Sequence, residues 1–175
     1  MTGGIRVRPS TPNDVEFICR ELRKHWLSTT IWSRDVEYKA DELPCLIAEH
    51  EGIAIGHLTI AFSGDEAEVV TLAACVDDQG IGTALLDAAG DQARCRGCRR
   101  IFLTTSNDNL RALAFYQKRG WRLVAVHRGM MDRYREREKE IPLIGLNGIP
   151  LRDEIELELV LIEDTNHAVD SPQRR

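Results

Sequence analysis

Two glycines, Gly80 and Gly82, separate a short apolar run from a segment whose apolar residues recur at helical spacing. The run covers residues 69–76 and contains several β-branched side chains, which predicts a strand followed by a turn and a helix. The first backbone N–H groups of a helix have no partner within it, and the helix dipole attracts negative charge to them. Glycines at this point let phosphate oxygens approach where a Cβ would collide. The pattern therefore predicts a binding site for phosphate groups at residues 79–84.

Two common phosphate-binding loops fit this turn poorly. The P-loop pattern G-x-x-x-x-G-K-[ST] requires a lysine directly after its second glycine, and none follows Gly82. The dinucleotide fingerprint G-x-G-x-x-G requires a third glycine where this chain has Leu85. It also requires an acidic residue at the end of the next strand, about 20 residues further on, and the chain has none at that interval. A nucleotide-binding oxidoreductase is therefore disfavoured and stays a third alternative.

A second pattern follows the strand-like segment 100–105, where residues 107–123 read NDNLRALAFYQKRGWRL. This segment resembles motif B of the GNAT superfamily of N-acetyltransferases, and the glycine turn with the TALL that follows it resembles motif A. The family pattern N-x-x-A-x-x-x-Y-x-x-x-G-[FW] is met by Asn109, Ala112, Tyr116, Gly120 and Trp121. The resemblance extends over residues 5–126. It implies an α/β protein with the GNAT fold, in which helices flank a mixed central sheet of about six to seven strands.

In the GNAT family the glycine turn holds the pyrophosphate of acetyl-CoA, so the resemblance implies acetyl-CoA as the cosubstrate. The residues that it assigns to the cofactor are Leu72, Ala73, Ala74, Gln79, Gly80, Ile81, Gly82, Thr83, Ala84, Asn109 and Tyr116. Residues 72–74 would act through their backbone, because in the family this strand splays from the next one and pairs with the pantetheine arm. Asn109 lies about two helical turns before Tyr116 on the same helix face, where it contacts the cofactor or caps the helix.

One position departs from the family pattern. Motif A usually carries Gln or Arg three residues before its first glycine, whereas this chain has Asp77 there and Gln79 beside Gly80. A carboxylate next to a pyrophosphate is unfavourable. Either Asp77 points away and Gln79 makes the contact, or the affinity for the cofactor is reduced.

Acyl transfer to an amine needs a base that leaves the amine neutral, donors for the oxyanion, and an acid that protonates the leaving thiolate. The resemblance implies Tyr116 as the general acid and Glu68, in the strand before the turn, as the general base. The backbone of residues 72–74 would supply the oxyanion donor. The structural alternatives are packing under the sheet for Tyr116 and an exposed strand edge for Glu68.

Other groups compete for the role of base. Glu66 is close in sequence, His57 and His127 are further options, and the family often uses an ordered water. Cys75 lies near the turn without a histidine partner in the local sequence, which disfavours a covalent cysteine intermediate. The expected reaction is therefore direct attack by a primary amine in a ternary complex. A non-catalytic protein that binds acyl-CoA as a sensor or scaffold is the alternative.

The composition excludes several other classes. The chain has 175 residues, 43% of them hydrophobic and 29% charged, which predicts one domain over residues 5–162. It has neither an apolar run near the ~20 residues that span a bilayer nor a signal-peptide pattern, so we expect a cytoplasmic protein without membrane contact. The net charge of −5 without a basic stripe disfavours nucleic acid as a partner. Five cysteines at irregular spacing, with one C-x-x-C at Cys95 and Cys98, predict neither a disulfide framework nor a metal site.

The other expected elements are a strand at 5–9, a helix ending near Trp26, a short helix at 38–43, strands at 45–49 and 53–62, and a last strand at 153–162 with one polar face.

An insertion at 129–150 precedes that last strand, and its charged part at 130–140 predicts a solvated helix. The insertion either flanks the acceptor site or decorates an edge or a homodimer contact. The polar tail 163–175 is expected to be disordered. Trp26, Trp32, the hairpin at His57 and the insertion would line the acceptor pocket. The acceptor itself stays open among small amines, aminoglycoside-like compounds and peptide N-termini.

Overall fold

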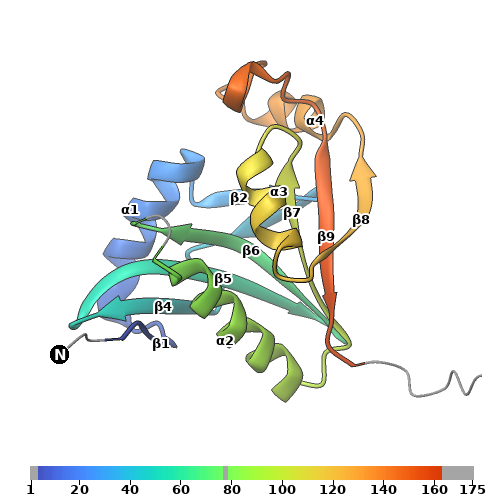
Figure 1. Ribbon diagram of the computed structural model, residues 1–175. Helices are drawn as coiled ribbons and strands as arrows, with labels where there is room; N and C mark the ends of the chain where they lie inside the picture. Colours follow the sequence, from blue (N-terminus) through green and yellow to red (C-terminus); the bar gives the residue numbers. More distant parts are fainter. Residues whose placement is uncertain (1–3, 77–78, 163–175) are drawn as a thin grey trace, which may run out of the picture.

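A computed structural model describes residues 4–76 and 79–162 of the chain. Its seven-stranded sheet has the order β1-β4-β5-β6-β7-β9-β8 (Figure 1). Neighbouring strands are antiparallel except β6 and β7, which run parallel. The strands of this sheet are β1 (Arg6–Pro9), β4 (Cys45–His50), β5 (Ile53–Ser63), β6 (Glu66–Ala74), β7 (Arg100–Ser106), β8 (Arg122–His127) and β9 (Glu154–Val160). The sheet confirms the mixed architecture predicted from the sequence.

Helices cover both faces of the sheet. The helices are α1 (Val15–Trp26), α2 (Ile81–Cys95), α3 (Leu110–Gln117) and α4 (Met130–Arg137). α2 and α3 lie on one face, and α1 lies on the other (Figure 1). Under α2 the main core buries Leu85 of the helix together with Leu157 of β9, and α1 contributes Leu22 to a second core with Ile47 of β4. Within the described residues, no helix is both long and apolar enough to cross a membrane.

The sheet opens between β6 and β7. The two strands pair only over residues 66–69 and 100–103, at the end where both begin. Beyond that point they diverge, and Figure 1 shows them as the two arms of a V. A register shift between β5 and β6 leaves Val70 out of the ladder, which increases the local bend of β6. The facing edges of both strands are therefore free to pair with another molecule.

The segment predicted as a short helix at 38–43 belongs in part to a separate hairpin. β2 (Thr30–Ser33) and β3 (Val36–Lys39) pair antiparallel with each other. Arg34 and Asp35 form the turn between them with φ of 48° and 67°. Such positive φ values belong to a type I′ turn, which glycine and asparagine favour. The helix prediction was wrong because a turn without those residues gives no hairpin signal in the sequence.

α4 opens the insertion and is partly buried, which corrects the prediction of a solvated helix. Its Met130, Met131 and Tyr134 pack with Leu151 in a third apolar cluster. Arginines on the other face of α4 bond to Asp35 in the β2–β3 turn. The charged residues between the buried positions hid this apolar face in the sequence.

The loop before α3 makes hydrogen bonds to the insertion and to the residues that follow it. The Asn107 side-chain oxygen accepts hydrogen bonds from the backbone N–H groups of Arg152 and Asp153 at 2.9 and 3.0 Å. Asp108, which is buried, accepts a hydrogen bond from the N–H of Leu146 at 2.6 Å. These bonds hold the insertion and the residues directly after it at the open end of the V.

Candidate active site

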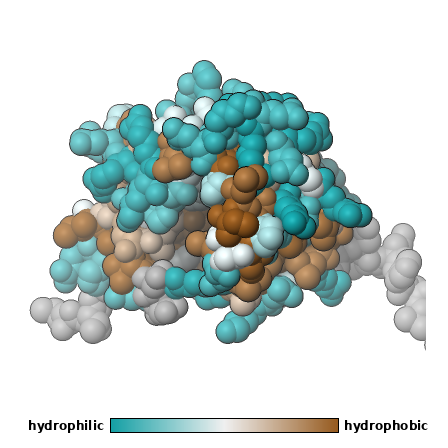
Figure 2. All heavy atoms as spheres, turned by 90° about the horizontal axis from the view of Figure 1, so that it is seen from above, coloured by the Kyte–Doolittle hydropathy of each residue, from teal (hydrophilic) through white to brown (hydrophobic). Residues whose placement is uncertain are grey.

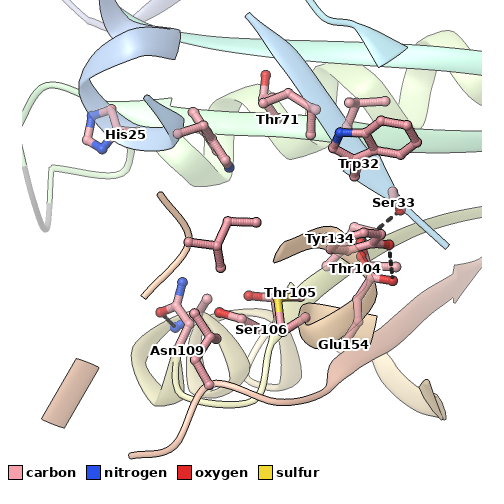
Figure 3. A pocket seen from close by; sticks show the side chains of 18 of the residues that line it. His25, Trp32, Ser33, Thr71, Thr104, Thr105, Ser106, Asn109, Tyr134 and Glu154 are labelled. Carbon is pink, nitrogen blue, oxygen red and sulfur yellow. Dashed lines mark hydrogen bonds between the residues drawn. The ribbon is translucent and has the colours of Figure 1, made fainter. Parts of the chain in front are cut away.

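A cavity of about 630 Å³ lies in the opening between β6 and β7. Residues 69–72 of β6 and 103–106 of β7 line it, together with parts of α1, β2, α3 and the insertion. Figure 2 looks onto the end of the molecule that carries α4 and shows a hollow bordered by hydrophobic and hydrophilic surface. Figure 3 shows Asn109 at one side of the cavity and Ser33, Thr104 and Glu154 gathered at the other.

The predicted phosphate turn follows the free end of β6. Gly80 precedes α2 with a φ of +79°, a left-handed conformation that glycine adopts without strain. The N–H of Ala84 bonds the carbonyl of Gly80 at 3.0 Å, so helix geometry leaves the N–H groups of residues 81–83 without an intrahelical partner. Gln79 and Gly80 are exposed beside them. The turn can therefore hold an anion. Asp77 lies outside the described residues, and its orientation stays a prediction.

An arginine from the end of α3 reaches this turn. Arg119 donates hydrogen bonds to the Thr83 hydroxyl from Nε at 2.9 Å and from Nη2 at 2.6 Å. Its guanidinium carbon lies 3.6 Å from the centre of the Phe115 ring. The same ring explains Gly82, because a Cβ at Gly82 would lie 3.0 Å from it. Arg119 thus brings a positive charge to the first turn of α2. Arg119 was not among the predicted site residues.

The backbone of β6 beside the opening alternates in direction. The N–H of Cys75 donates to the carbonyl of Ile55 at 2.8 Å. Because hydrogen-bonded pairs alternate along an antiparallel ladder, residues 73 and 71 also form hydrogen-bonded pairs with β5. The N–H and C=O groups of Leu72 and Ala74 therefore point away from β5 and into the opening, whereas those of Ala73 point toward β5. Leu72 also lines the cavity. Two of the three predicted backbone positions thus face the opening.

Tyr116 lies on the cavity wall. It is 8% exposed, and its ring centre lies 5.2 Å from that of Phe115 and 5.7 Å from that of Trp121. The residue therefore packs under the sheet and lines the cavity at once. Burial raises the pKa of its phenol, so the hydroxyl keeps its proton at neutral pH and can donate it.

Asn109 caps α3, as one of its two predicted roles required. Its side-chain oxygen accepts a hydrogen bond from the N–H of Ala112 at 3.1 Å. The residue also lines the cavity, which leaves its amide nitrogen available to a ligand. Its contact with the cofactor stays a prediction.

Glu68 is buried and faces the β2–β3 hairpin. Its carboxylate accepts hydrogen bonds from the Ser33 hydroxyl at 2.5 Å and from the Tyr38 hydroxyl at 2.8 Å. A guanidinium nitrogen of Arg34 lies 3.7 Å away. Because Glu68 is 3% exposed, the alternative of an exposed strand-edge glutamate is wrong. Ser33 lines the cavity and Glu68 does not, so any proton that Glu68 takes from a ligand in the cavity must pass through a neighbour.

The predicted polar face of the last strand is a buried acidic row. Glu154 and Glu156 of β9 are 2% and 4% exposed. Glu154 lines the cavity and accepts hydrogen bonds from the Thr104 hydroxyl at 2.9 Å, the Tyr134 hydroxyl at 3.1 Å and the N–H of Arg34 at 2.9 Å. Burial raises the pKa of Glu154 against the opposing effect of these donors. Glu154 was not predicted as a site residue, because alternation predicts a polar face but not what covers it.

The two histidines considered as bases lie elsewhere. His57 is fully buried among Phe17 and Trp26, with Nε2 3.4 Å from the Thr71 hydroxyl. Burial lowers the pKa of His57 to about 4, so it is neutral at physiological pH. His127 places Nε2 2.9 Å from a carboxylate oxygen of Glu156. Neither histidine is among the residues that line the cavity.

The cavity end beside the insertion is largely apolar and aromatic. The residues that line this end are Trp26, Leu27, Ile31, Trp32, Met131, Tyr134, Ile141, Pro142, Leu146 and Leu151. The indole N–H of Trp32 donates to Glu138 at 3.3 Å, which adds a carboxylate to this wall. Two tryptophans and the insertion thus border the cavity as predicted, whereas the hairpin at His57 contributes no lining residue.

Comparison with known proteins identifies the family. The model of the acetyltransferase (GNAT) family matches residues 14–121. The chain belongs to the GNAT acetyltransferase family. The uncharacterized protein YdhI of Bacillus subtilis (strain 168) is 39% identical to it over 133 residues, which make up 75% of this chain and 83% of YdhI.

Two solved structures share the GNAT fold. A Bacillus subtilis acetyltransferase in complex with CoA superimposes with a TM-score of 0.66 at 21% identity, covering 91% of this chain and 99% of its own. A GNAT family acetyltransferase from Elizabethkingia anophelis with acetyl-CoA bound gives a TM-score of 0.65 at 21% identity, covering 90% and 99%. The family and the fold implied by the sequence motifs are therefore confirmed.

Proposed function

We propose that this GNAT protein is an acetyl-CoA-dependent N-acetyltransferase that acts on a primary amine by direct attack in a ternary complex. The observation that carries the proposal is the cavity between β6 and β7. Free strand edges border it and a buried phenol lies on its wall, and β6 leads on along the chain to a helix start suited to phosphate. The solved GNAT proteins that contain CoA or acetyl-CoA support the choice of cosubstrate.

Acetyl-CoA would bind along β6 and the start of α2. The pyrophosphate would accept hydrogen bonds from the N–H groups of Ile81, Gly82 and Thr83, and Arg119 would add its charge. The pantetheine arm would pair with the outward backbone groups of Leu72 and Ala74, as an added strand pairs with a sheet edge. Asn109 would reach the same arm through its amide nitrogen. Gln79, Gly80 and Ala84 would border the phosphates. Ala73 would hold the cofactor-binding part of β6 in place through its pairing with β5.

The reaction would then proceed in the cavity. A neutral amine attacks the thioester carbonyl, and a backbone N–H of the free β6 edge stabilises the oxyanion. As the intermediate collapses, the C–S bond breaks and Tyr116 gives its proton to the thiolate of CoA. The attacking nitrogen loses a proton at the same stage, which restores the phenol. Glu68 would serve as the base that first makes the amine neutral, taking the proton through a neighbour that lines the cavity.

The cavity indicates the kind of acceptor. Its apolar and aromatic end suits a hydrocarbon or aromatic group, and the carboxylates of Glu138 and Glu154 suit an ammonium before transfer. A small amine or a peptide N-terminus with an apolar neighbour fits both features. The retained Tyr116 favours a catalyst over a non-catalytic sensor, which has no use for a proton donor at this wall.

The cofactor assignment is tested by calorimetric titration with acetyl-CoA, CoA and NAD. We expect acetyl-CoA and CoA to bind and NAD not to bind. Thr83→Glu places a carboxylate at the turn and should weaken acetyl-CoA binding by at least about tenfold. Thr83→Gln, which has nearly the shape of glutamate without its charge, serves as the control. Unchanged affinity in Thr83→Glu would remove the phosphate assignment.

A further inference from the structure

Four oxygen-bearing side chains form a line of contacts that starts in the cavity and ends at the buried Glu68. The Thr104 hydroxyl lies 2.9 Å from Glu154, 2.9 Å separates the Thr104 and Ser33 hydroxyls, and the Ser33 hydroxyl lies 2.5 Å from Glu68. Three of the four residues, Glu154, Thr104 and Ser33, line the cavity. Figure 3 shows these three close together on one side of the cavity. We call the four residues the carboxyl–hydroxyl chain.

The number of protons in the carboxyl–hydroxyl chain is informative. Each of the two hydroxyls carries one proton, and each hydrogen bond needs a proton of its own. When both carboxyls are ionised, two protons serve three oxygen–oxygen contacts, so one contact lacks a hydrogen bond. A single added proton on either carboxyl completes all three. The chain is therefore built to accept one proton.

We propose that the carboxyl–hydroxyl chain is the general base of the reaction, with Glu154 taking a proton from the acceptor ammonium and sharing it with Glu68 through Thr104 and Ser33. The proposal rests on the proposed function and deepens it. It makes Glu154 a catalytic residue, because Glu154 lines the cavity in which the amine would bind. Thr104, Ser33 and Glu68 act through it.

The proton transfer balances without any further reactant. The ammonium N–H bond breaks, its electron pair stays on nitrogen, and the proton forms an O–H bond on Glu154. Glu154 then donates to Thr104, Thr104 to Ser33 and Ser33 to Glu68. If each proton moves along its own hydrogen bond, one proton passes from Glu154 to Glu68 and the hydroxyls are regenerated. Water in the open cavity takes the proton after the product leaves.

The surroundings of the chain favour one shared proton. Glu154 faces Tyr134, the backbone N–H of Arg34 and the more distant His127, and Glu156 follows two residues later. Glu68 faces Tyr38 and the guanidinium of Arg34. Two buried carboxyls linked in this way disfavour a second negative charge, and burial raises the pKa of Glu154 in the same direction. Arg34 partly offsets this effect, so the chain can also release its proton.

A titration of the ligand-free protein tests the shared proton without any acetyl transfer. The carboxyl carbons of ¹³C-labelled glutamates are followed by NMR against pH, and Glu68→Gln and Glu154→Gln assign the two signals. Both carbons should move with one common midpoint in the native protein. In Thr104→Val they should move separately, and Thr104→Ser, which restores the hydroxyl, should recover the common midpoint. Independent midpoints in the native protein would overturn the proposal.

Kinetics test the use of this proton. Glu154→Gln should lower kcat/KM at least about 100-fold with a strongly basic alkylamine, and less than about threefold with a weakly basic aromatic amine that is already neutral. Thr104→Val should lower kcat/KM with the alkylamine about tenfold, and Thr104→Ser should restore it. Equal losses for both amines would show a structural role for Glu154 and contradict the proposal. If the native protein acetylates no amine at all, the proposed function fails, and the NMR titration still decides whether the carboxyls share a proton.

Discussion

Replacing Tyr116 by Phe separates the chemical step from binding. Tyr116→Phe removes one oxygen and keeps the ring, which packs against Phe115 and Trp121. Within residues 4–76 and 79–162, the structure records no hydrogen bond to the Tyr116 hydroxyl. The free energy of unfolding should therefore change by less than about 1 kcal/mol. Acetyl-CoA affinity should stay within about threefold, because backbone groups and the α2 turn carry the proposed cofactor contacts.

The expected loss of rate follows from the leaving group. General acid catalysis contributes about 10²–10⁴ in rate. A thiolate is a better leaving group than an amine or alkoxide, since a thiol of ordinary pKa about 8.5 already ionises near neutral pH. The lower end of the range applies, so kcat should fall about 100-fold, which corresponds to about 2.7 kcal/mol in the barrier. The raised pKa of the phenol keeps the native residue protonated across the assay range.

The assay measures the rate of thiol release from acetyl-CoA and, by calorimetry on the same sample, the affinity for acetyl-CoA. The native protein and Tyr116→Phe are compared at several pH values with one amine. A control is Thr59→Val, which removes a buried hydroxyl that bonds to Thr71 and does not line the cavity. Tyr116→Phe should reduce kcat far more than it reduces acetyl-CoA affinity. Equal losses in rate and affinity, or an unchanged kcat, would refute Tyr116 as the acid.

Three further outcomes follow from the described contacts. Arg119→Gln should weaken acetyl-CoA binding about threefold to tenfold and reduce the salt dependence of that binding. Lys118→Gln makes the same change of charge one residue away and should have neither effect. Calorimetry at two salt concentrations checks both variants. Asn109→Ala should lower the free energy of unfolding by about 1 kcal/mol and Asn109→Asp should not, as denaturant titration would show. Because burial lowers the pKa of His57 from 6.5 to about 4, the unfolded chain binds more protons between these values, so stability should fall by up to about 3 kcal/mol as pH drops through that window. The fall should shrink in His57→Gln, and an equal fall in both proteins would count against the buried histidine.

The parts of the site that are local in sequence could be predicted. The strand, the glycine turn and α2 follow one another directly, so hydrophobic periodicity and turn chemistry specify them together. The cap at Asn109 and the wall position of Tyr116 belong to one short helix with its own pattern. Each of these features needs only a few neighbouring residues.

The remaining parts depend on contacts between distant segments. Ser33 meets Glu68, and Thr104 meets Glu154, only after the β2–β3 hairpin covers the sheet and β9 inserts between β7 and β8. The hairpin turn at Arg34 carries no glycine or asparagine, so its sequence gave no warning of that cover. Arg119 reaches Thr83 because α3 packs on α2 through Phe115, which no local pattern encodes.

The central claim is that acetyl-CoA and an amine react in the cavity between β6 and β7. The most direct measurement is thiol release from acetyl-CoA against a panel of primary amines, with the product of each amine weighed by mass spectrometry. The account predicts thiol release that depends on the amine and an amine product heavier by one acetyl group. Acetyl-CoA binding without amine-dependent release across alkyl, aromatic and peptide amines would contradict it.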